Sequence, residues 1–154
     1  MDLRTLTQSL TVSGQILPAD LPSIAARGFR AIIDNRPDGE EEGQPASAAL
    51  AATARRLGLG FRYIPVVPGQ LSEEKVAAFR AALEELDKPV LAFCRTGTRS
   101  TGLWALSEAH RQEPSALIRA AGGAGYDLGG LAPRLASLAE AAAKGHPRVD
   151  PTIE

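Results

Sequence analysis

The single cysteine of this 154-residue chain, Cys94, stands between an apolar run and a loop of arginine, glycine and hydroxyl side chains. The segment reads Pro-Val-Leu-Ala-Phe at 89–93 and Cys-Arg-Thr-Gly-Thr-Arg-Ser at 94–100. This pattern predicts a buried strand, a tight loop and a helix that begins at Ser100 or Thr101. Backbone N–H groups that curl around a point at the positive end of a helix bind anions. We therefore expect an anion site in front of the cysteine sulfur.

The same surroundings favour a reactive thiol. A position at a helix N-terminus beside arginine lowers the pKa of a cysteine from about 8.5 to between about 3.5 and 7.5. We interpret Cys94 as a nucleophile and Arg99 as a fork for two oxygens of a tetrahedral oxyanion. A hydroxyl of Ser100 or Thr101 is expected to bond to the sulfur or to cap the helix. The other predicted anion-binding residues of the loop are Arg95, Thr96, Gly97, Thr98 and Ser100.

A second interpretation of Cys94 stays open at this point. A lone cysteine at the end of an apolar strand is commonly a small buried hydrophobic residue. Here no apolar side chain follows until Leu103, and the intervening residues include two arginines. This composition favours the reactive thiol.

Composition limits the remaining possibilities. The length suits one domain, which we place at 1–145, followed by a loose tail at 146–154. Seventeen basic and eighteen acidic residues give a net charge of −1, so we expect no nucleic-acid partner. One cysteine and two histidines argue against a disulfide framework and a zinc site, and we expect no metal or cofactor. The sequence contains neither a signal-peptide pattern nor a membrane-length apolar run, which predicts a cytoplasmic protein without a membrane partner.

Helix and strand patterns alternate along the chain. They predict a three-layer α/β fold with a mostly parallel sheet of about four to five strands flanked by helices. The expected strands lie within 6–15, 29–34, 61–67 and 89–94, and the expected helices begin near positions 18, 46, 72, 100, 115 and 133. The cysteine loop then lies at the carboxyl end of a central strand.

The loop at 35–45 is dense in turn residues and charge. It could be a solvated connection. However, loops that follow the carboxyl ends of parallel strands line the binding crevice of open α/β sheets. Arg36, as an anion-binding residue, and Asp38 could therefore face Cys94.

Several segments together resemble one known family. They are Ser13-Gly14-Gln15, Gly28-Phe29, the run Asp-Asn-Arg-Pro-Asp-Gly-Glu at 34–40, Pro68-Gly69-Gln70-Leu71 and the loop at 94–100. In these pieces, which span residues 13 to about 106, the chain resembles the phosphatase-like domain of the beta-lactamase hydrolase-like protein family. That bacterial branch is related to the cysteine-based tyrosine and dual-specificity phosphatases. The resemblance implies a protein-tyrosine-phosphatase-like fold, Cys94 as nucleophile, Arg99 as phosphate binder, and a phosphorylated substrate or other tetrahedral oxyanion as partner.

Three features depart from the familiar phosphatase pattern. Four residues separate Cys94 from Arg99, where those enzymes have five. Phe93 stands where they usually have a histidine, and the segment at 64–71 lacks the aspartate expected of a general acid. Asp38 is our first candidate for that acid, and the alternatives are Asp34, Glu73 and Glu74.

These residues leave three functions open. The leading one is hydrolysis of phosphate monoesters through a phosphocysteine on Cys94. The first alternative is a rhodanese-type sulfurtransferase, or another protein that handles a persulfide on Cys94. Four intervening residues also fit that group, although its typical Gly-His-Ile-Pro-Gly-like segment is absent. The second alternative is a pseudophosphatase whose loop only binds an anion.

Overall fold

A five-stranded sheet forms the centre of the computed structural model, which describes residues 1–145, so the tail expected at 146–154 lies outside the described residues. The strands are β1 (Arg4–Thr5), β2 (Leu10–Ser13), β3 (Ala31–Asp34), β4 (Gly60–Tyr63) and β5 (Val90–Phe93). Their order is β1-β2-β5-β3-β4, and only the edge strand β1 is antiparallel to its neighbour. The predicted mostly parallel α/β sheet is confirmed, with β5 at its centre.

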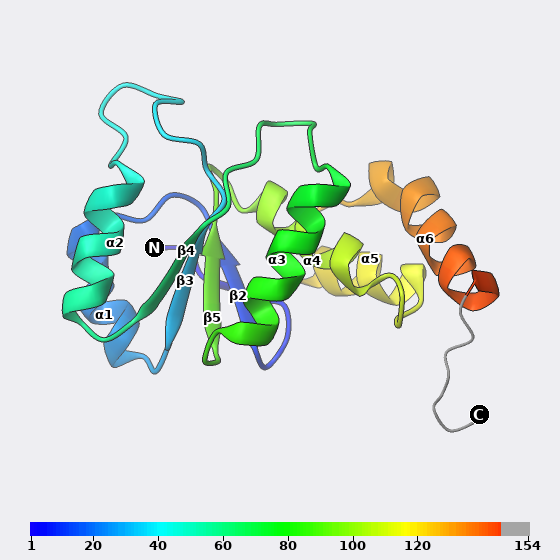
Figure 1. Ribbon diagram of the computed structural model, residues 1–154, viewed down its shortest axis with the longest axis horizontal. Coiled ribbons are helices and arrows are strands. Elements are labelled where there is room, and N and C mark those ends of the chain that lie inside the picture. The colour runs from blue at the N-terminus through cyan, green and yellow to red at the C-terminus, as the bar shows by residue number, and fades with distance from the viewer. Residues whose placement is uncertain (146–154) are drawn as a thin grey trace.

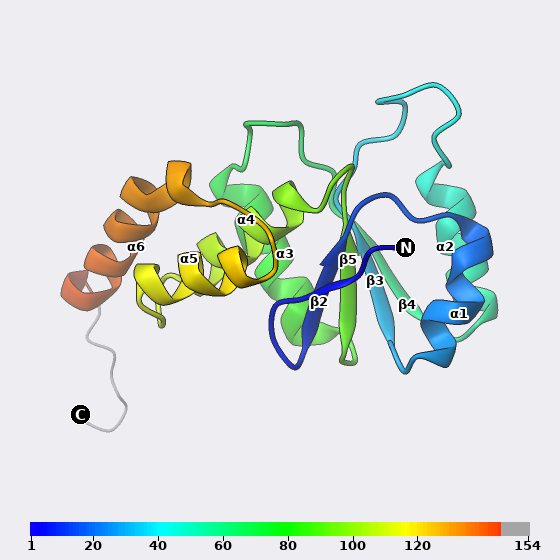
Figure 2. The same ribbon diagram turned by 180° about the vertical axis from the view of Figure 1, so that it is seen from behind.

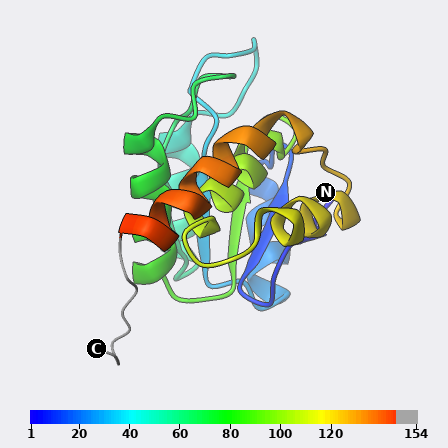
Figure 3. The ribbon, with the colours of Figure 1, turned by 90° about the vertical axis from the view of Figure 1, so that its right-hand side faces the viewer.

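Helices cover both faces of this sheet and give three layers (Figures 1 and 2). The α-helices are α1 (Leu21–Ala26), α2 (Ser47–Arg56), α3 (Glu73–Glu85), α4 (Thr98–Glu108), α5 (Pro114–Gly123) and α6 (Ala132–Gly145). The short 3₁₀ helices are η1 (Pro18–Asp20) and η2 (Gly129–Leu131). Helices α1 and α2 lie on one face and the remaining four on the other, with α6 outermost in Figure 3. Within residues 1–145, no helix has the length and apolarity that a membrane crossing requires.

The apolar run before Cys94 is buried on both faces of the sheet. Leu91 and Phe93 pack among apolar residues of α1 and α2. Val90 and Ala92 point to the opposite core, which α3 to α6 complete. All four side chains are fully buried, and burying a large apolar side chain stabilises a fold by about 1.5–3 kcal/mol. The burial of β5 therefore fixes the position at which the cysteine loop begins.

Two predicted boundaries differ from the structure. The helix after the cysteine loop begins at Thr98 instead of Ser100 or Thr101, because Gly97 already ends the loop with a φ of 99°. The strand expected at 61–67 ends at Tyr63. Beyond it the N–H groups of Ile64 and Val66 still bond to the β3 end, but Pro65 has no N–H to donate.

Three loops meet at the carboxyl end of the sheet, which is at the top of Figure 1. One connects β3 to α2, one connects β4 to α3, and the third follows β5. Asn35 joins all three, because its backbone N–H donates to Phe93 O (2.8 Å) and its side chain bonds to Ile64 O and Ser100 Oγ. This junction holds the candidate site.

Candidate functional site

Gly97 sets the shape of the loop between β5 and α4. Its φ of 99° lies in the left-handed region that favours glycine. A Cβ at this position would also collide with the hydroxyl oxygen of Tyr126. A second close approach occurs at Gly14, where a Cβ would lie 2.9 Å from Arg95 O. Both glycines allow neighbouring segments to close around the loop.

Cys94 lies deeper than the sequence suggests. Its side chain is fully buried, and its sulfur accepts the backbone N–H of Gly97 at 3.0 Å. We expected the sulfur at the mouth of the anion site, but Cys94 is not among the residues that line the cavity beside the loop. The sulfur is therefore closed off from solvent in this structure.

The carbonyl groups of the loop are bound by groups outside it. Gln15 N–H donates to Arg95 O (3.3 Å), and Tyr126 hydroxyl donates to Thr96 O (3.0 Å). Gly97 O accepts from the backbone and hydroxyl of Thr101. No acceptor from residues 1–145 is found for the backbone N–H groups of Arg95, Thr96, Arg99 and Ser100. Such unpaired N–H groups at a helix start can bind an anion.

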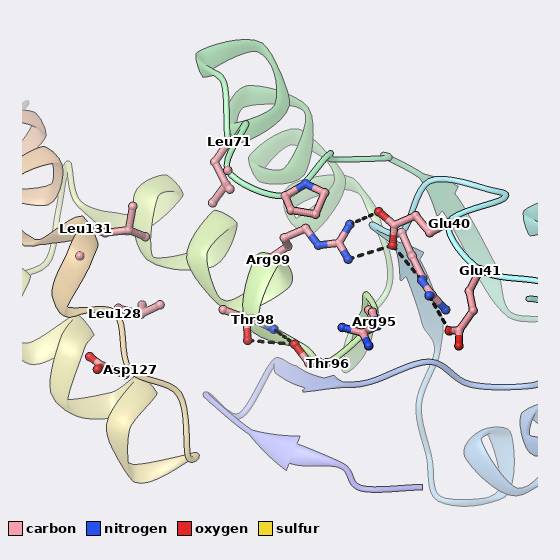
Figure 4. Close-up of a pocket in the computed structure, with 14 residues that line it drawn as sticks. Glu40, Glu41, Leu71, Arg95, Thr96, Thr98, Arg99, Asp127, Leu128 and Leu131 are labelled. Carbon is pink, nitrogen blue, oxygen red and sulfur yellow. Dashed lines mark hydrogen bonds and ion pairs between the residues drawn. The ribbon is translucent and has the colours of Figure 1, made fainter.

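Arg99 extends from the first turn of α4 toward the β3–α2 loop (Figure 4). Its Nη1 donates to Glu40 Oε2 (2.7 Å) and Val66 O (2.8 Å), and its Nη2 donates to Glu40 Oε1 (3.0 Å). A guanidinium has five N–H bonds. The side edge, with Nε–H and the second Nη2–H, donates to no acceptor among the described residues. That edge can bind two oxygens of an anion.

Glu40 is a site residue that the sequence reasoning missed. It accepts hydrogen bonds from Arg99 and, at 2.9 Å, from Arg36 Nε. The hydrogen bond from Arg99, with a further one from Arg36, lowers the pKa of Glu40 although partial burial opposes this shift. Glu40 is therefore a carboxylate that orients Arg99, and it is unsuited to donate a proton. Glu40 lies within the charged loop at 35–45, 59 residues before Arg99, so no local sequence pattern indicates that the two side chains pair.

Arg36, which we expected to bind the anion, lines the cavity with a guanidinium that is bonded to neighbouring side chains. Its buried guanidinium donates to Glu40 Oε1, Gln15 Oε1 and Glu41 Oε1. Each of the three guanidinium nitrogens of Arg36 thus donates one hydrogen bond to a side chain of the protein. Arg36 therefore positions Glu40, and through it Arg99.

Asp38 also differs from our expectation. Its carboxylate accepts the backbone N–H (2.8 Å) and the hydroxyl (3.0 Å) of Ser47, the first residue of α2. Its own N–H donates to Tyr63 Oη. Asp38 does not line the cavity and instead stabilises the start of α2, so the structure argues against its assignment as the general acid.

The alternative acids of the sequence analysis also lie outside this cavity. Asp34 is buried and accepts the N–H of Arg36, and its burial raises its pKa to about 7. Glu73 lines a separate groove between α3, α4 and α6, and Glu74 is exposed on α3.

The hydroxyl groups expected at the sulfur bond elsewhere. Ser100 is fully buried, and its Oγ donates to Asn35 Oδ1 at 2.8 Å. Thr101 Oγ1 donates to Gly97 O at 2.7 Å. Thr96 and Thr98 are exposed on the cavity side, with their hydroxyls 3.0 Å apart. The expectation for Ser100 and Thr101 side chains is thus wrong, although the Ser100 N–H remains available.

A cavity of about 870 Å³ opens beside the loop. Figure 4 shows its charged side at Arg99 and its apolar side at the leucines. Its lining comprises Arg36, Glu40, Glu41, Pro68, Gly69, Leu71, Arg95, Thr96, Thr98, Arg99, Asp127, Leu128, Gly130 and Leu131. Arginines hold Glu40 and Glu41, whereas Asp127 makes no ion pair within residues 1–145 and accepts only the N–H of Gly129 (2.9 Å).

Tyr126 connects this apolar side to the cysteine loop. Besides its bond to Thr96 O, its ring lies against the position that a Gly97 side chain would occupy. Burial raises the pKa of Tyr126 above its ordinary value. The segment that carries Asp127 is thus anchored to the loop through the preceding residue.

Comparison with known proteins agrees with this fold. A beta-lactamase hydrolase-like protein of Agrobacterium fabrum is 40% identical over 104 residues, which are 68% of this chain and 24% of that protein. The chain thus spans about a quarter of that relative. A crystal structure of a candidate phosphatase from Neisseria meningitidis is 36% identical, with a TM-score of 0.81, over 90% of this chain and 99% of the other.

More distant structures share the fold. Tk-PTP in its active form superimposes with a TM-score of 0.69 at 17% identity, over 90% of this chain and 97% of the other. The family model described as "Beta-lactamase hydrolase-like protein, phosphatase-like domain" matches residues 2–111. The five-stranded sheet with helices on both faces is the fold expected for this family. The chain belongs to the beta-lactamase hydrolase-like protein, phosphatase-like domain family and has a protein-tyrosine-phosphatase-like fold.

Proposed function

We propose that this chain hydrolyses phosphate monoesters through a phosphocysteine on Cys94. The observation that carries the proposal is the orientation of Arg99. Glu40 and Val66 hold one end of its guanidinium, and the side edge has no bonded partner among the described residues. The loop that precedes Arg99 supplies further N–H groups that are unpaired within residues 1–145. Such preorganised donors stabilise the charge that develops on the equatorial oxygens during phosphoryl transfer.

The chemistry proceeds in two steps. The sulfur of Cys94 attacks phosphorus, so the S–P bond forms while the bond from phosphorus to the leaving oxygen breaks. That oxygen takes a proton from an acid and leaves as an alcohol or phenol. Water then attacks phosphorus, gives a proton to the same group, and releases phosphate and the thiolate.

Asp127 is our candidate for the proton donor, in place of Asp38. It lines the cavity, and its second carboxylate oxygen has no hydrogen-bond partner among the described residues. Glu40 and Glu41, the other carboxylates of the cavity, are each bound by arginine. Asp127 also lies next to Tyr126, which bonds directly to the cysteine loop.

Sulfur transfer is a second candidate, which the length of the loop favours. Only four residues separate Cys94 from Arg99, and persulfide chemistry needs no acid at the leaving group. The sulfur would take the outer sulfur atom of thiosulfate, release sulfite, and pass that atom to a thiolate or cyanide acceptor. An anion-binding pseudophosphatase is the remaining possibility.

Parallel assays distinguish these functions. We expect the chain to hydrolyse an aryl phosphate and Cys94→Ser to abolish this activity while retaining the fold. Thiosulfate-dependent formation of thiocyanate from cyanide, without phosphatase activity, would instead support the sulfurtransferase. Phosphate binding with neither activity would identify a pseudophosphatase.

A further inference from the structure

Gln15 lies just beyond the end of β2 and contacts two parts of the candidate site. Its backbone N–H donates to Arg95 O at 3.3 Å, and its side-chain Oε1 accepts a hydrogen bond from Arg36 Nη1 at 3.0 Å. The Nε2 of the same amide donates to Ile16 O at 2.8 Å, so the acceptor end of the amide faces Arg36. Gln15 therefore joins the cysteine loop to the guanidinium of Arg36.

The pairing of β2 with β5 fixes the position of Gln15. All four residues of β2 pair with β5, and Ser13 O accepts the N–H of Cys94 at 3.3 Å. Gly14 then allows the chain to pass close to the loop, because a Cβ there would lie 2.9 Å from Arg95 O. That oxygen belongs to the backbone, so no side-chain rotation would relieve the contact. The strands that place Cys94 therefore also place Gln15.

The hydrogen bonds of Gln15 complete a closed ring beside the cavity. Arg36 donates to Gln15 and, through Nε, to Glu40 Oε1 at 2.9 Å. The same Glu40 oxygen accepts from Arg99 Nη2 at 3.0 Å, in the pair that Figure 4 shows. Arg99 follows Arg95 on the path from the cysteine loop into α4, which returns the ring to Gln15. The ring thus connects the chain segments that follow β2, β3 and β5.

Arg36 depends on Gln15 because its side chain is buried. Only 3% of Arg36 is exposed, and each of its guanidinium nitrogens donates to a side chain. Without Gln15 Oε1, a buried charged donor would lose its acceptor, which is unfavourable. The guanidinium would then turn toward Glu41, an exposed carboxylate that already accepts from Arg36 Nη2 at 3.1 Å. Such a turn would draw Arg36 Nε away from Glu40, which would then hold the Arg99 guanidinium less firmly.

We propose that Gln15 is a positioning residue for the anion site, because through Arg36 and Glu40 it fixes the plane of the Arg99 guanidinium. This inference rests on the proposed function, since that plane matters only where two oxygens of an anion bind the side edge of Arg99. Gln15 does not line the cavity, so it acts through its neighbours and not by touching the substrate. Loss of its acceptor should therefore weaken both anion binding and turnover.

Equilibrium binding of inorganic phosphate tests this role separately from turnover. Gln15→Met removes the acceptor at nearly the same side-chain length, and Gln15→Asn keeps an amide on a shorter side chain. We expect calorimetry to show phosphate binding about three- to tenfold more weakly in both variants. The kcat/KM for p-nitrophenyl phosphate should fall by a larger factor, about 10–30-fold, because the plane of Arg99 matters most in the transition state.

A double-mutant cycle with Glu40→Gln separates positioning from a general loss of structure. Because Gln15 acts through Glu40, adding Gln15→Met to Glu40→Gln should change the phosphate affinity by less than about 1.5-fold further. A merely structural effect would multiply with the effect of Glu40→Gln. Gln112→Met is the matched control, because Gln112 Nε2 also donates to a charged side chain, Glu108 Oε1 at 3.0 Å, but lies beyond the other end of α4. It should leave the phosphate affinity unchanged.

Two results would overturn the inference. One is an unchanged phosphate affinity in the Gln15 variants, and the other is a pair of losses that multiply in the double variant. If Gln15→Met does not fold, Gln15→Asn takes its place in the same cycle. If the phosphate affinities follow these expectations but the unsubstituted chain does not hydrolyse p-nitrophenyl phosphate, the role of Gln15 in anion binding stands and the proposed hydrolysis fails.

Discussion

At the scale of residues, the site depends on Arg99, which uses some of its N–H donors within the protein and keeps others for an anion. Glu40 and Val66 take the end of the Arg99 guanidinium, and the side edge remains for an anion. Arg36 holds Glu40 from the other side. Glu40 therefore orients the guanidinium of Arg99. A substrate phosphate can bind the side edge of Arg99 without displacing Glu40 from the other end.

Substitution of the two loop arginines tests this division. Arg99→Lys should lower kcat/KM for an aryl phosphate by about 10²–10³-fold, because an ammonium cannot bond to Glu40 and two phosphate oxygens in one plane. Arg95 is exposed and makes no side-chain bond within the described residues, so Arg95→Lys should change kcat/KM by less than about threefold. Steady-state kinetics of both variants provides the measurement. Equal losses would contradict the assignment of Arg99.

The role of Asp127 predicts a dependence on the leaving group. Asp127→Asn should slow hydrolysis of an alkyl phosphate by about 10²–10⁴-fold and leave that of p-nitrophenyl phosphate nearly unchanged, because nitrophenolate needs no protonation. Asp38→Asn is the control, since it should weaken the start of α2 by about 0.5–2 kcal/mol without altering the leaving-group dependence. Similar losses for both esters in Asp127→Asn would exclude this role.

At the scale of elements, the loop after β5 is held by its glycines and by contacts from distant segments. Strand β5 and the position of Cys94 could be predicted, because an apolar run and turn residues are local signals. The Glu40–Arg99 pair and the Asp38–Ser47 cap could not, because both join side chains that only the folded loops bring together. The contacts of Tyr126 with Thr96 and Gly97 depend on the same long-range packing.

Gly97→Ala tests the shape of the loop. Its φ of 99° and the contact with Tyr126 should make the substitution destabilise the fold by at least 1 kcal/mol and weaken phosphate binding. Gly122→Ala is the matched control, because Gly122 lies in α5 with no atom near its Cβ position. That variant should be neutral or more stable by up to about 1 kcal/mol. Thermal unfolding should therefore show a lower stability for Gly97→Ala only, and calorimetry a weaker affinity for phosphate in that variant only. An unchanged phosphate affinity in Gly97→Ala would contradict the loop geometry.

At the scale of the whole molecule, loops from β3, β4 and β5 join at one end of the sheet, with a buried acid below them. Burial raises the pKa of Asp34 to about 7, so the folded protein keeps a proton that the unfolded chain loses near pH 4. Between about pH 4 and pH 7, unfolding therefore releases the proton of Asp34. Stability from this group is full below about pH 4 and declines as the pH rises to about 7.

Asp34→Asn should remove that dependence, because an amide can still accept the N–H of Arg36 but does not titrate. The free energy of unfolding, measured by denaturant at several pH values, should fall from pH 5 to pH 7 in the unsubstituted chain by up to about 1.4 kcal/mol per pH unit. The variant should show a flatter profile over the same range. Glu40, with its lowered pKa, acts in the opposite direction at lower pH, where stability is lost as its carboxylate is protonated. Parallel profiles above pH 5 would contradict the raised pKa of Asp34.

The identity of the group that Cys94 carries during turnover tests the central claim most directly. The chain is mixed with an aryl phosphate, quenched in acid and digested, and the peptide that contains Cys94 is analysed by mass spectrometry beside a sample treated with thiosulfate. The account predicts one phosphoryl group on Cys94 in the first sample, and none in Arg99→Lys under the same conditions. An unmodified Cys94 with the aryl phosphate, together with a persulfide from thiosulfate, would contradict it.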